Sequence, residues 1–224
     1  MNGHSLSAMD GHRSRSPGGT RLEEFLAGLP IETRWTSGHH TVWQTGQQNG
    51  PNNIGPDDHT HCSALVAAIA LYLDIYILRP PNHQQHLLAN AQIDWLMATR
   101  ILPGPSAAAS GWRVLGRSAT EGVLDSAVTA ANLGKLVVAG YRQPPITDPT
   151  TRKTRSGHVV IVRPQSSSFS ATDGPLVAMA GNRNWHSIHM RGAFHSHPTA
   201  WPNNIHLFAH DTDLEIEVTA KGAA

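Results

Sequence analysis

The sequence predicts a single α+β domain in which helices precede an antiparallel β-sheet. The chain has 224 residues, of which 39% are hydrophobic, and this is enough for one domain with a sizeable core. Helical patterns occupy the first part of the chain, whereas short apolar runs bounded by Gly, Pro or polar residues fill the second part. Helices followed by strands are typical of an antiparallel sheet covered by helices.

The first helical pattern follows a polar N-terminal segment. Residues 1–19 are rich in Ser, Gly and Arg and show no periodic apolar pattern, so we expect a disordered lead-in. Apolar side chains then recur at helical spacing, with Thr20 as the expected N-cap and Pro30 as the closing residue. We therefore expect one folded domain over residues 20–224.

A second helical pattern, over residues 62–73, is apolar on nearly every side. A helix without a polar face lies at the centre of a domain, so this segment is predicted to be a buried central helix packed on the sheet. Further helices are expected at residues 84–99 and 120–133, and Gly134 is the expected C-cap of the last one. A short hairpin is expected within residues 33–45.

The second half of the chain carries the predicted strands. They are four apolar runs, at residues 136–141, 158–162, 176–180 and 205–209. Two polar segments, 47–61 and 141–157, are predicted to be surface loops that form the walls of a groove.

The charge and cysteine counts exclude several classes of protein. The chain carries 17 Lys and Arg against 16 Asp and Glu, so its net charge of +1 gives no bulk attraction to nucleic acid or anionic membrane. No stretch approaches the roughly 20 apolar residues that span a bilayer. The N-terminal segment lacks the apolar core of a secretory signal. We expect synthesis in the cytoplasm without a visible signal peptide, no nucleic-acid partner and no membrane span.

The single cysteine, Cys62, stands where the buried helix begins, directly after a polar loop. Unpaired N–H groups and the partial positive charge at a helix N-terminus stabilise a thiolate and lower the pKa of a cysteine. A nucleophilic cysteine fits this position, although a small apolar residue in an Ala- and Leu-rich helix also explains it.

A cysteine nucleophile needs a base, and His158 is the candidate. It follows Gly157 and opens a strongly apolar strand, which can hold the imidazole ring in place. An isolated histidine at a strand edge is more often structural, but a thiol and an imidazole on two rigid elements favour a catalytic pair.

A third residue usually orients the imidazole of such a pair. The predicted strand 176–180 runs into Asn182 and Asn184, and an antiparallel neighbour of the His158 strand would bring one of them near the ring. Asn184 is favoured slightly, because Trp185 beside it could shield the pair from water. Both asparagines equally suit a turn.

These three blocks, HCSALVAAIALYL, GHVVIVRP and VAMAGNRNW, together resemble the papain-like cysteine amidase superfamily. The resemblance is closest to the CHAP and NlpC-like cell-wall amidases and to type VI secretion amidase effectors. It covers roughly residues 52–210. It implies a papain-like fold with a helix packed on an antiparallel sheet, and metal-free cleavage of amide bonds in peptidoglycan peptides.

Carried onto this chain, the resemblance implies Cys62 as nucleophile, His158 as base and Asn182 or Asn184 as the orienting residue. Asn53 is the expected side-chain donor of the oxyanion hole, beside the Cys62 backbone N–H. Trp185 and His195 are expected to line the substrate groove.

For an effector of this kind the resemblance also implies two features of its surroundings. The first is an immunity protein that plugs the groove. The second is export to the periplasm or the extracellular space by a dedicated secretion system, although the missing signal equally fits an enzyme released by lysis or a cytoplasmic peptidase. No cofactor is expected.

Fifteen histidines, six of them in three clusters, raise a second hypothesis, a zinc-dependent hydrolase. The clusters are His59/His61 beside Cys62, His186/His189 and His195/His197. No HExxH motif occurs and acidic ligands are sparse near the clusters, so the spacings complete no recognisable ligand set. A third hypothesis is a non-catalytic binding module on the same fold, in which Cys62 is merely packed.

Overall fold

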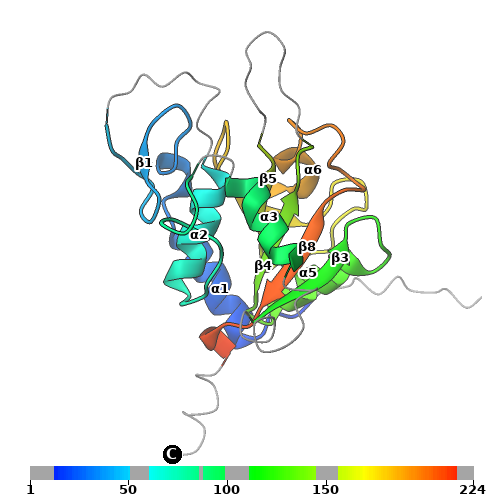
Figure 1. Cartoon of the computed structure of the whole chain (residues 1–224). Coiled ribbons are helices and arrows are strands. Elements are labelled where there is room, and N and C mark those ends of the chain that lie inside the picture. The colour runs from blue at the N-terminus through cyan, green and yellow to red at the C-terminus, as the bar shows by residue number, and fades with distance from the viewer. Residues whose placement is uncertain (1–12, 51–60, 86–87, 99–110, 145–155, 216–224) are drawn as a thin grey trace, which may run out of the picture.

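The computed structural model describes residues 13–50, 61–85, 88–98, 111–144 and 156–215. A six-stranded sheet runs through the molecule in the order β3-β8-β4-β5-β6-β7, and every neighbouring pair is antiparallel (Figure 1). The α+β class with an antiparallel sheet is confirmed. The strands are β3 (Trp112–Arg117), β4 (Leu136–Tyr141), β5 (His158–Val162), β6 (Leu176–Met179), β7 (Trp185–His189) and β8 (His206–His210).

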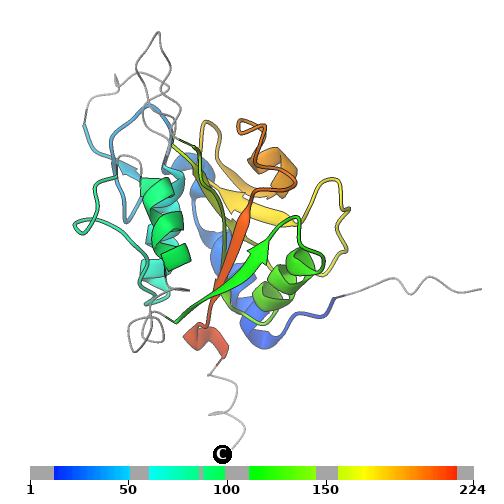
Figure 2. The same cartoon turned by 45° about the vertical axis from the view of Figure 1, so that its right-hand side comes forward.

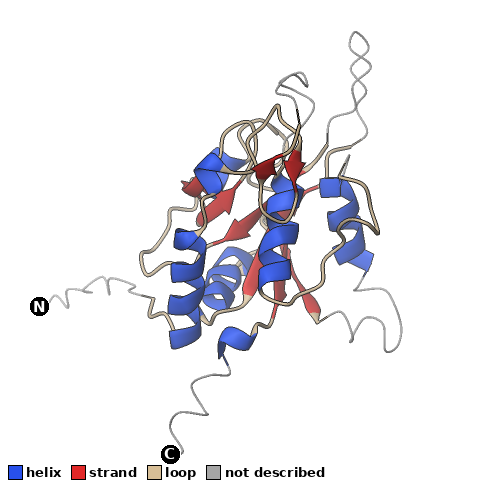
Figure 3. Ribbon diagram, turned by 90° about the vertical axis from the view of Figure 1, so that its left-hand side faces the viewer, coloured by secondary structure: helices blue, strands red, loops and turns tan. Residues whose placement is uncertain are grey.

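Helices cover both faces of this sheet (Figures 1 and 2). The first layer comprises α1 (Pro17–Gly28), α2 (Cys62–Tyr72) and α3 (Leu88–Ala98), which lie in front of the strands in Figure 3. The second layer comprises α5 (Val123–Asn132) and α6 (Met190–Ala193). No helix in the described segments is long and apolar enough to cross a membrane.

Alternate side chains of β4 and β5 belong to different cores. In β5, Val159 and Ile161 pack with the first helix layer, whereas Val160 and Val162 pack with the second. Every residue of both strands is buried. Because side chains alternate between the two faces, a strand covered on both sides needs an unbroken apolar sequence. This explains why these two runs are visible in the sequence with their correct bounds.

The first helix begins earlier than the sequence suggests. Ser16 is its N-cap and accepts a hydrogen bond from the Gly19 N–H at 3.0 Å, and Pro17 takes the first helical position. Thr20 therefore lies in the first turn and is not the cap. The expected boundary between residues 19 and 20 is wrong as a start of ordered structure, since it falls inside α1. Residues 1–12 lie outside the described part.

The two edge strands, β3 and β7, are absent from the predicted set. Their residues are partly exposed, and each strand carries a register shift against its neighbour, so neither shows a clean apolar alternation. The remaining elements are η1 (Ile31–Thr33), η2 (Asp213–Glu215) and a hairpin of β1 (Thr41–Val42) with β2 (Gln47–Gln48). This hairpin lies further along the chain than the predicted one.

A buried ion pair fastens α1 to the sheet. Arg163, which follows β5, is 7% exposed and donates to both carboxylate oxygens of Glu23 on α1, at 3.2 and 2.6 Å. Its third nitrogen donates to the backbone carbonyl of His186 in β7. The pair is bidentate and hydrogen-bonded, which is the geometry that compensates the cost of burying a guanidinium.

Replacement of Glu23 by Ala is expected to lower the free energy of unfolding by about 2–3 kcal/mol, because Arg163 is left buried without a counter-charge. Urea denaturation monitored by circular dichroism measures this loss. Glu24→Ala is the matched control, since Glu24 is the exposed neighbour on the same helix, and it should change stability by less than about 0.5 kcal/mol. Equal losses in the two variants would contradict the assignment.

Candidate active site

Cys62 is the first residue of α2, as predicted, and is 2% exposed. The residue before it, His61, is fixed by two hydrogen bonds. Its Nε2 lies 2.8 Å from the carbonyl oxygen of His39 and its Nδ1 lies 3.3 Å from Thr41 Oγ1. The carbonyl can only accept, so Nε2 carries the proton and Nδ1 accepts from the hydroxyl. His61 thereby attaches the β1 region to the start of α2.

The Cys62 thiol lies against the start of β5. Burial raises the pKa of this thiol, while backbone N–H groups of Val159, Ser63 and Cys62 itself lower it and oppose that effect. Burial dominates, so the sulfur is protonated at neutral pH in this structure. The contact with the Val159 N–H shows where the Cys62 sulfur lies, because Val159 directly follows His158. The sulfur therefore lies beside the backbone of the predicted base.

The His158 imidazole points away from that sulfur. In the antiparallel register His158 faces Tyr141, whose side chain belongs to the second core. The ring packs edge-on against Phe194, at 5.3 Å between ring centroids, and stacks on His197 at 5.8 Å. Cys62 and Val159 belong to the first core. The two predicted catalytic side chains thus lie on opposite faces of the sheet.

This arrangement leaves the predicted Cys62–His158 pair unassembled. The Nε2 atom of His158 is buried and has no hydrogen-bond partner, and within the described ranges no hydrogen bond joins the two side chains. Burial, followed by the charge of His197, lowers the pKa of His158 to about 3. At neutral pH the structure therefore holds a neutral thiol and a neutral imidazole.

Asn90 of α3 holds the backbone directly before His158 in place. Its Oδ1 accepts from the N–H groups of Gly157 at 3.0 Å and Gln143 at 3.1 Å, and its Nδ2 donates to the Gln143 carbonyl at 3.0 Å. A Cβ at Gly157 would lie 2.3 Å from the Tyr141 carbonyl oxygen and 2.5 Å from Asn90 Oδ1. The glycine before His158 is therefore required by the contact between α3 and the ends of β4 and β5.

The expected approach of β6 to His158 is confirmed, but its asparagines do not orient the ring. β6 is the antiparallel neighbour of β5, and a Cβ at Gly181 would lie 3.6 Å from His158 Cε1. Asn182, the next residue, is exposed, and its backbone carbonyl accepts from Ser37 Oγ at 3.5 Å.

Asn184 holds a turn together. Its Oδ1 accepts from the Gly181 N–H at 3.1 Å, and its Nδ2 donates to the carbonyls of Ile31 at 2.9 Å and Arg34 at 2.5 Å. Both amide hydrogens are used, so the side chain links the β6–β7 turn to η1. The expected orienting role of Asn184 is therefore not what the geometry shows.

The other predicted site residues are dispersed or fall outside the described ranges. Trp185 is 39% exposed at the start of the edge strand β7, and His195 is exposed after α6. Asn53 lies outside the described residues. The histidine that does meet His158 is His197, whose Nδ1 lies 3.1 Å from Gln143 Oε1. The HxH spacing of His195 and His197 marks this residue in the sequence, but it suggests a metal or groove cluster and not a neighbour of His158.

The histidine clusters do not form a metal centre in the part of the chain that the structure describes, where no group of three or more potential ligands converges. His61 uses both ring nitrogens, as described above. His186 Nε2 contacts the Leu29 carbonyl and His189 Nδ1 contacts the Gly174 carbonyl at 2.9 Å, so these rings take part in local packing.

No match was found for this chain among protein-family models, curated proteins or solved structures.

Gly157→Ala is expected to lower the free energy of unfolding by about 2–3 kcal/mol, because its methyl group would collide with fixed backbone and with Asn90. Chemical denaturation provides the measurement. Gly28→Ala is the control, since a Cβ at Gly28 meets nothing within 4 Å. If Gly157→Ala were as stable as Gly28→Ala, the contact between Asn90 and the strand ends would be wrong.

His158 predicts a specific pH dependence of stability. Its folded-state pKa of about 3 lies below the unfolded value of 6.5, so between these pH values the unfolded chain binds one more proton. The contribution is constant above pH 6.5, and stability falls by about 1.4 kcal/mol per pH unit as the pH drops below it.

Replacing His158 by Phe should remove that slope. Unfolding free energies of the wild type and of His158→Phe are measured from pH 7.5 to pH 4.5. The two curves should run parallel above pH 6.5, and below it the wild-type free energy should fall more steeply with decreasing pH than that of the variant. Parallel curves would show that His158 is accessible to protons in the folded protein.

Proposed function

We propose that the protein is a cysteine-dependent amide hydrolase with a papain-like arrangement, in which Cys62 is the nucleophile and His158 the general acid and base. One contact carries the proposal: the Cys62 sulfur, at the N-terminus of the buried helix α2, lies beside the Val159 N–H directly after His158. Cys62 and His158 therefore occupy neighbouring backbone positions on two rigid elements, although their side chains lie on opposite faces of the sheet.

The proposed reaction uses the two residues in turn. His158 takes the thiol proton, and the thiolate attacks the amide carbonyl to form a tetrahedral intermediate. The imidazolium then protonates the leaving amine, and the C–N bond breaks to leave a thioester. A water molecule, deprotonated by His158, hydrolyses the thioester and restores the thiol. The Cys62 backbone N–H, at the helix start, is the first donor for the oxyanion.

Catalysis requires the His158 ring to turn across the end of β5. Its ladder with β6 begins only at Ile161, so the start of β5 is paired on one side alone. The unpartnered Nε2 means that the turn breaks no hydrogen bond of that atom. It does give up the packing against Phe194 and His197. The described geometry then corresponds to a resting state, with both groups neutral.

The substrate class rests on the sequence resemblance. The blocks around Cys62, His158 and Asn184 resemble cell-wall amidases, so we assign peptide amide bonds of bacterial peptidoglycan as the substrate. The same resemblance supports an antibacterial effector that reaches the periplasm or extracellular space through a dedicated secretion system, with an immunity protein as partner.

A second function, a non-catalytic binding module, is favoured by one specific observation. The thiol is buried with a raised pKa, and the imidazole lies on the other face of the sheet. On this view Cys62 and His158 are core residues of two different layers. The experiment below separates the two functions.

Purified peptidoglycan is incubated with the wild type, Cys62→Ala and His158→Gln, and the released fragments are identified by mass spectrometry. We expect new amine and carboxyl termini with the wild type only, and losses of at least a thousandfold in both variants, because nucleophile and base act as a unit. His189→Gln is the matched control, since this exposed histidine lies away from Cys62 in β7 and should retain activity.

Cleavage that persists in Cys62→Ala would overturn the cysteine mechanism. Activity that is abolished by a chelator and restored by zinc would favour the metal hydrolase. Absence of cleavage by the wild type, with tight binding of the same peptidoglycan, would favour the binding module.

A further inference from the structure

A pocket of about 510 Å³ lies between helix α5, the edge strand β3 and the neighbouring end of β8. It is on the face of the sheet opposite to α2, so it is separate from the Cys62 thiol. The volume falls within the range of about 300–1,000 Å³ that small-molecule sites occupy. Nothing proposed above for Cys62 and His158 uses this pocket.

The pocket lining contains both apolar and cationic side chains. Leu115 of β3 and Ala130 of α5 line it, and Leu133 stands beside them with 45% of its surface exposed. A leucine exposed to this extent at the mouth of a pocket is a surface that an apolar ligand would cover. The cationic residues of the lining are Arg113 and Lys135.

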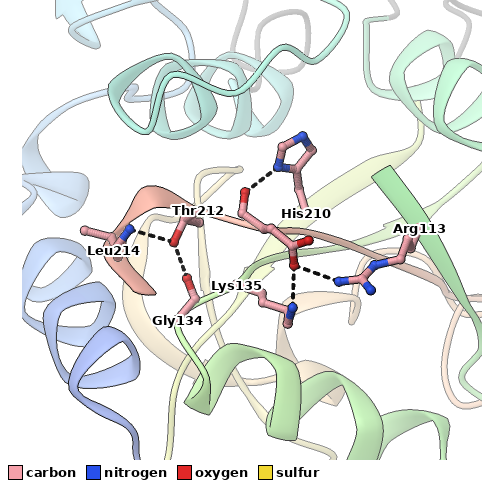
Figure 4. Close-up of polar contacts among 7 residues, drawn as sticks. Arg113, Gly134, Lys135, His210, Thr212 and Leu214 are labelled. Atoms are coloured by element: carbon pink, nitrogen blue, oxygen red, sulfur yellow. Dashed lines mark hydrogen bonds and ion pairs between the residues drawn. The ribbon is translucent and has the colours of Figure 1, made fainter. Parts of the chain in front are cut away.

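These two cations converge on a single oxygen atom (Figure 4). Arg113 Nη2 lies 2.7 Å from Asp211 Oδ1, and Lys135 Nζ binds the same oxygen. The hydrogen bond from Lys135 holds the pKa of Asp211 below its usual range, so the carboxylate is ionised at neutral pH. Asp211 itself does not line the pocket. The Asp211 carboxylate therefore lies outside the pocket and binds both cationic residues of the pocket lining.

The backbone around this cluster is held by hydrogen bonds, and the Asp211 carboxylate stands at the surface. Thr212 is buried and donates to the Gly134 carbonyl at 2.7 Å, and the Leu214 N–H donates to Thr212 Oγ1 at 3.3 Å (Figure 4). The Asp211 side chain is 60% exposed, that of Arg113 is 57% exposed and that of Lys135 is 19% exposed. The exposed pair with Arg113 contributes little to stability, and an anion that also reaches Lys135 can replace Asp211 without leaving that less exposed ammonium unpaired.

The remaining acid of the pocket wall is already neutralised. Asp125 of α5 forms an ion pair with Arg13, which does not line the pocket. An incoming anion therefore meets two cations and no unpaired carboxylate among the lining residues. The two cations and the apolar side chains of the pocket lining together indicate a ligand with one negative charge and an apolar body.

We propose that this pocket binds a small amphipathic carboxylate, with its apolar body against Leu115, Ala130 and Leu133 and its carboxylate on Arg113 and Lys135. The ligand carboxylate displaces Asp211 from the two cations, and Asp211 turns into solvent. Binding therefore depends on the charge of the ligand, on Lys135 and, with opposite sign, on Asp211.

Isothermal titration of the full chain with decanoate tests this proposal. We expect saturable binding of one molecule, and at least tenfold weaker binding of decanol, which has the same tail without the charge. Lys135→Met keeps most of the apolar length of the side chain and removes its charge, so it should weaken decanoate binding about tenfold. Asp211→Asn removes the competing carboxylate and should strengthen it about threefold.

Asp94→Asn is the matched control, because Asp94 forms a surface ion pair with Arg142, and neither residue lines the pocket. It should leave binding unchanged. The proposal is overturned if decanoate does not bind, if decanol binds equally well, or if Lys135→Met and Asp211→Asn shift the affinity in the same direction. Circular dichroism of each variant verifies that the fold is retained.

Discussion

Coverage of the sheet by helices on both faces is the constraint on which the rest of this structure depends. It requires β4 and β5 to be apolar along nearly their whole length, with His158 as a buried polar residue at the start of β5, and it divides the core into two clusters of side chains, one on each face of the sheet. Each residue of β5 belongs to one layer by its position alone. His158 therefore shares a layer with Val160 and Phe194, while the thiol of Cys62 shares one with Val159.

That division sets the chemistry of the candidate site. Removal from water favours the uncharged forms of both groups, so it raises the pKa of Cys62 and lowers that of His158. A thiolate–imidazolium pair is stabilised only where the two groups meet, since each ion then compensates the other. The structure keeps them apart and neutral, and proposed catalysis depends on a motion that joins them.

The central strands and the start of α2 could be predicted from the sequence, but the face of the sheet on which a given side chain lies could not. β4, β5 and the start of α2 were predictable because unbroken apolar runs have clear ends, and the pairing of β6 with β5 followed from their order. The edge strands β3 and β7 were not, because partial exposure and register shifts blur their periodicity. The side of the sheet taken by His158 depends on which helices cover each face, which is a tertiary property. Asn184 likewise found partners on η1, far away in the sequence.

The contact between Asn90 and the strand ends has a consequence for how this protein can vary. Asn90 joins Gln143 to Gly157 through three hydrogen bonds, so a helix side chain holds the base of the connection between β4 and β5 closed. The position of His158 is then independent of the length and composition of the chain between those two residues. Natural variation or a grafted recognition loop can be accommodated there while the register of the sheet is preserved.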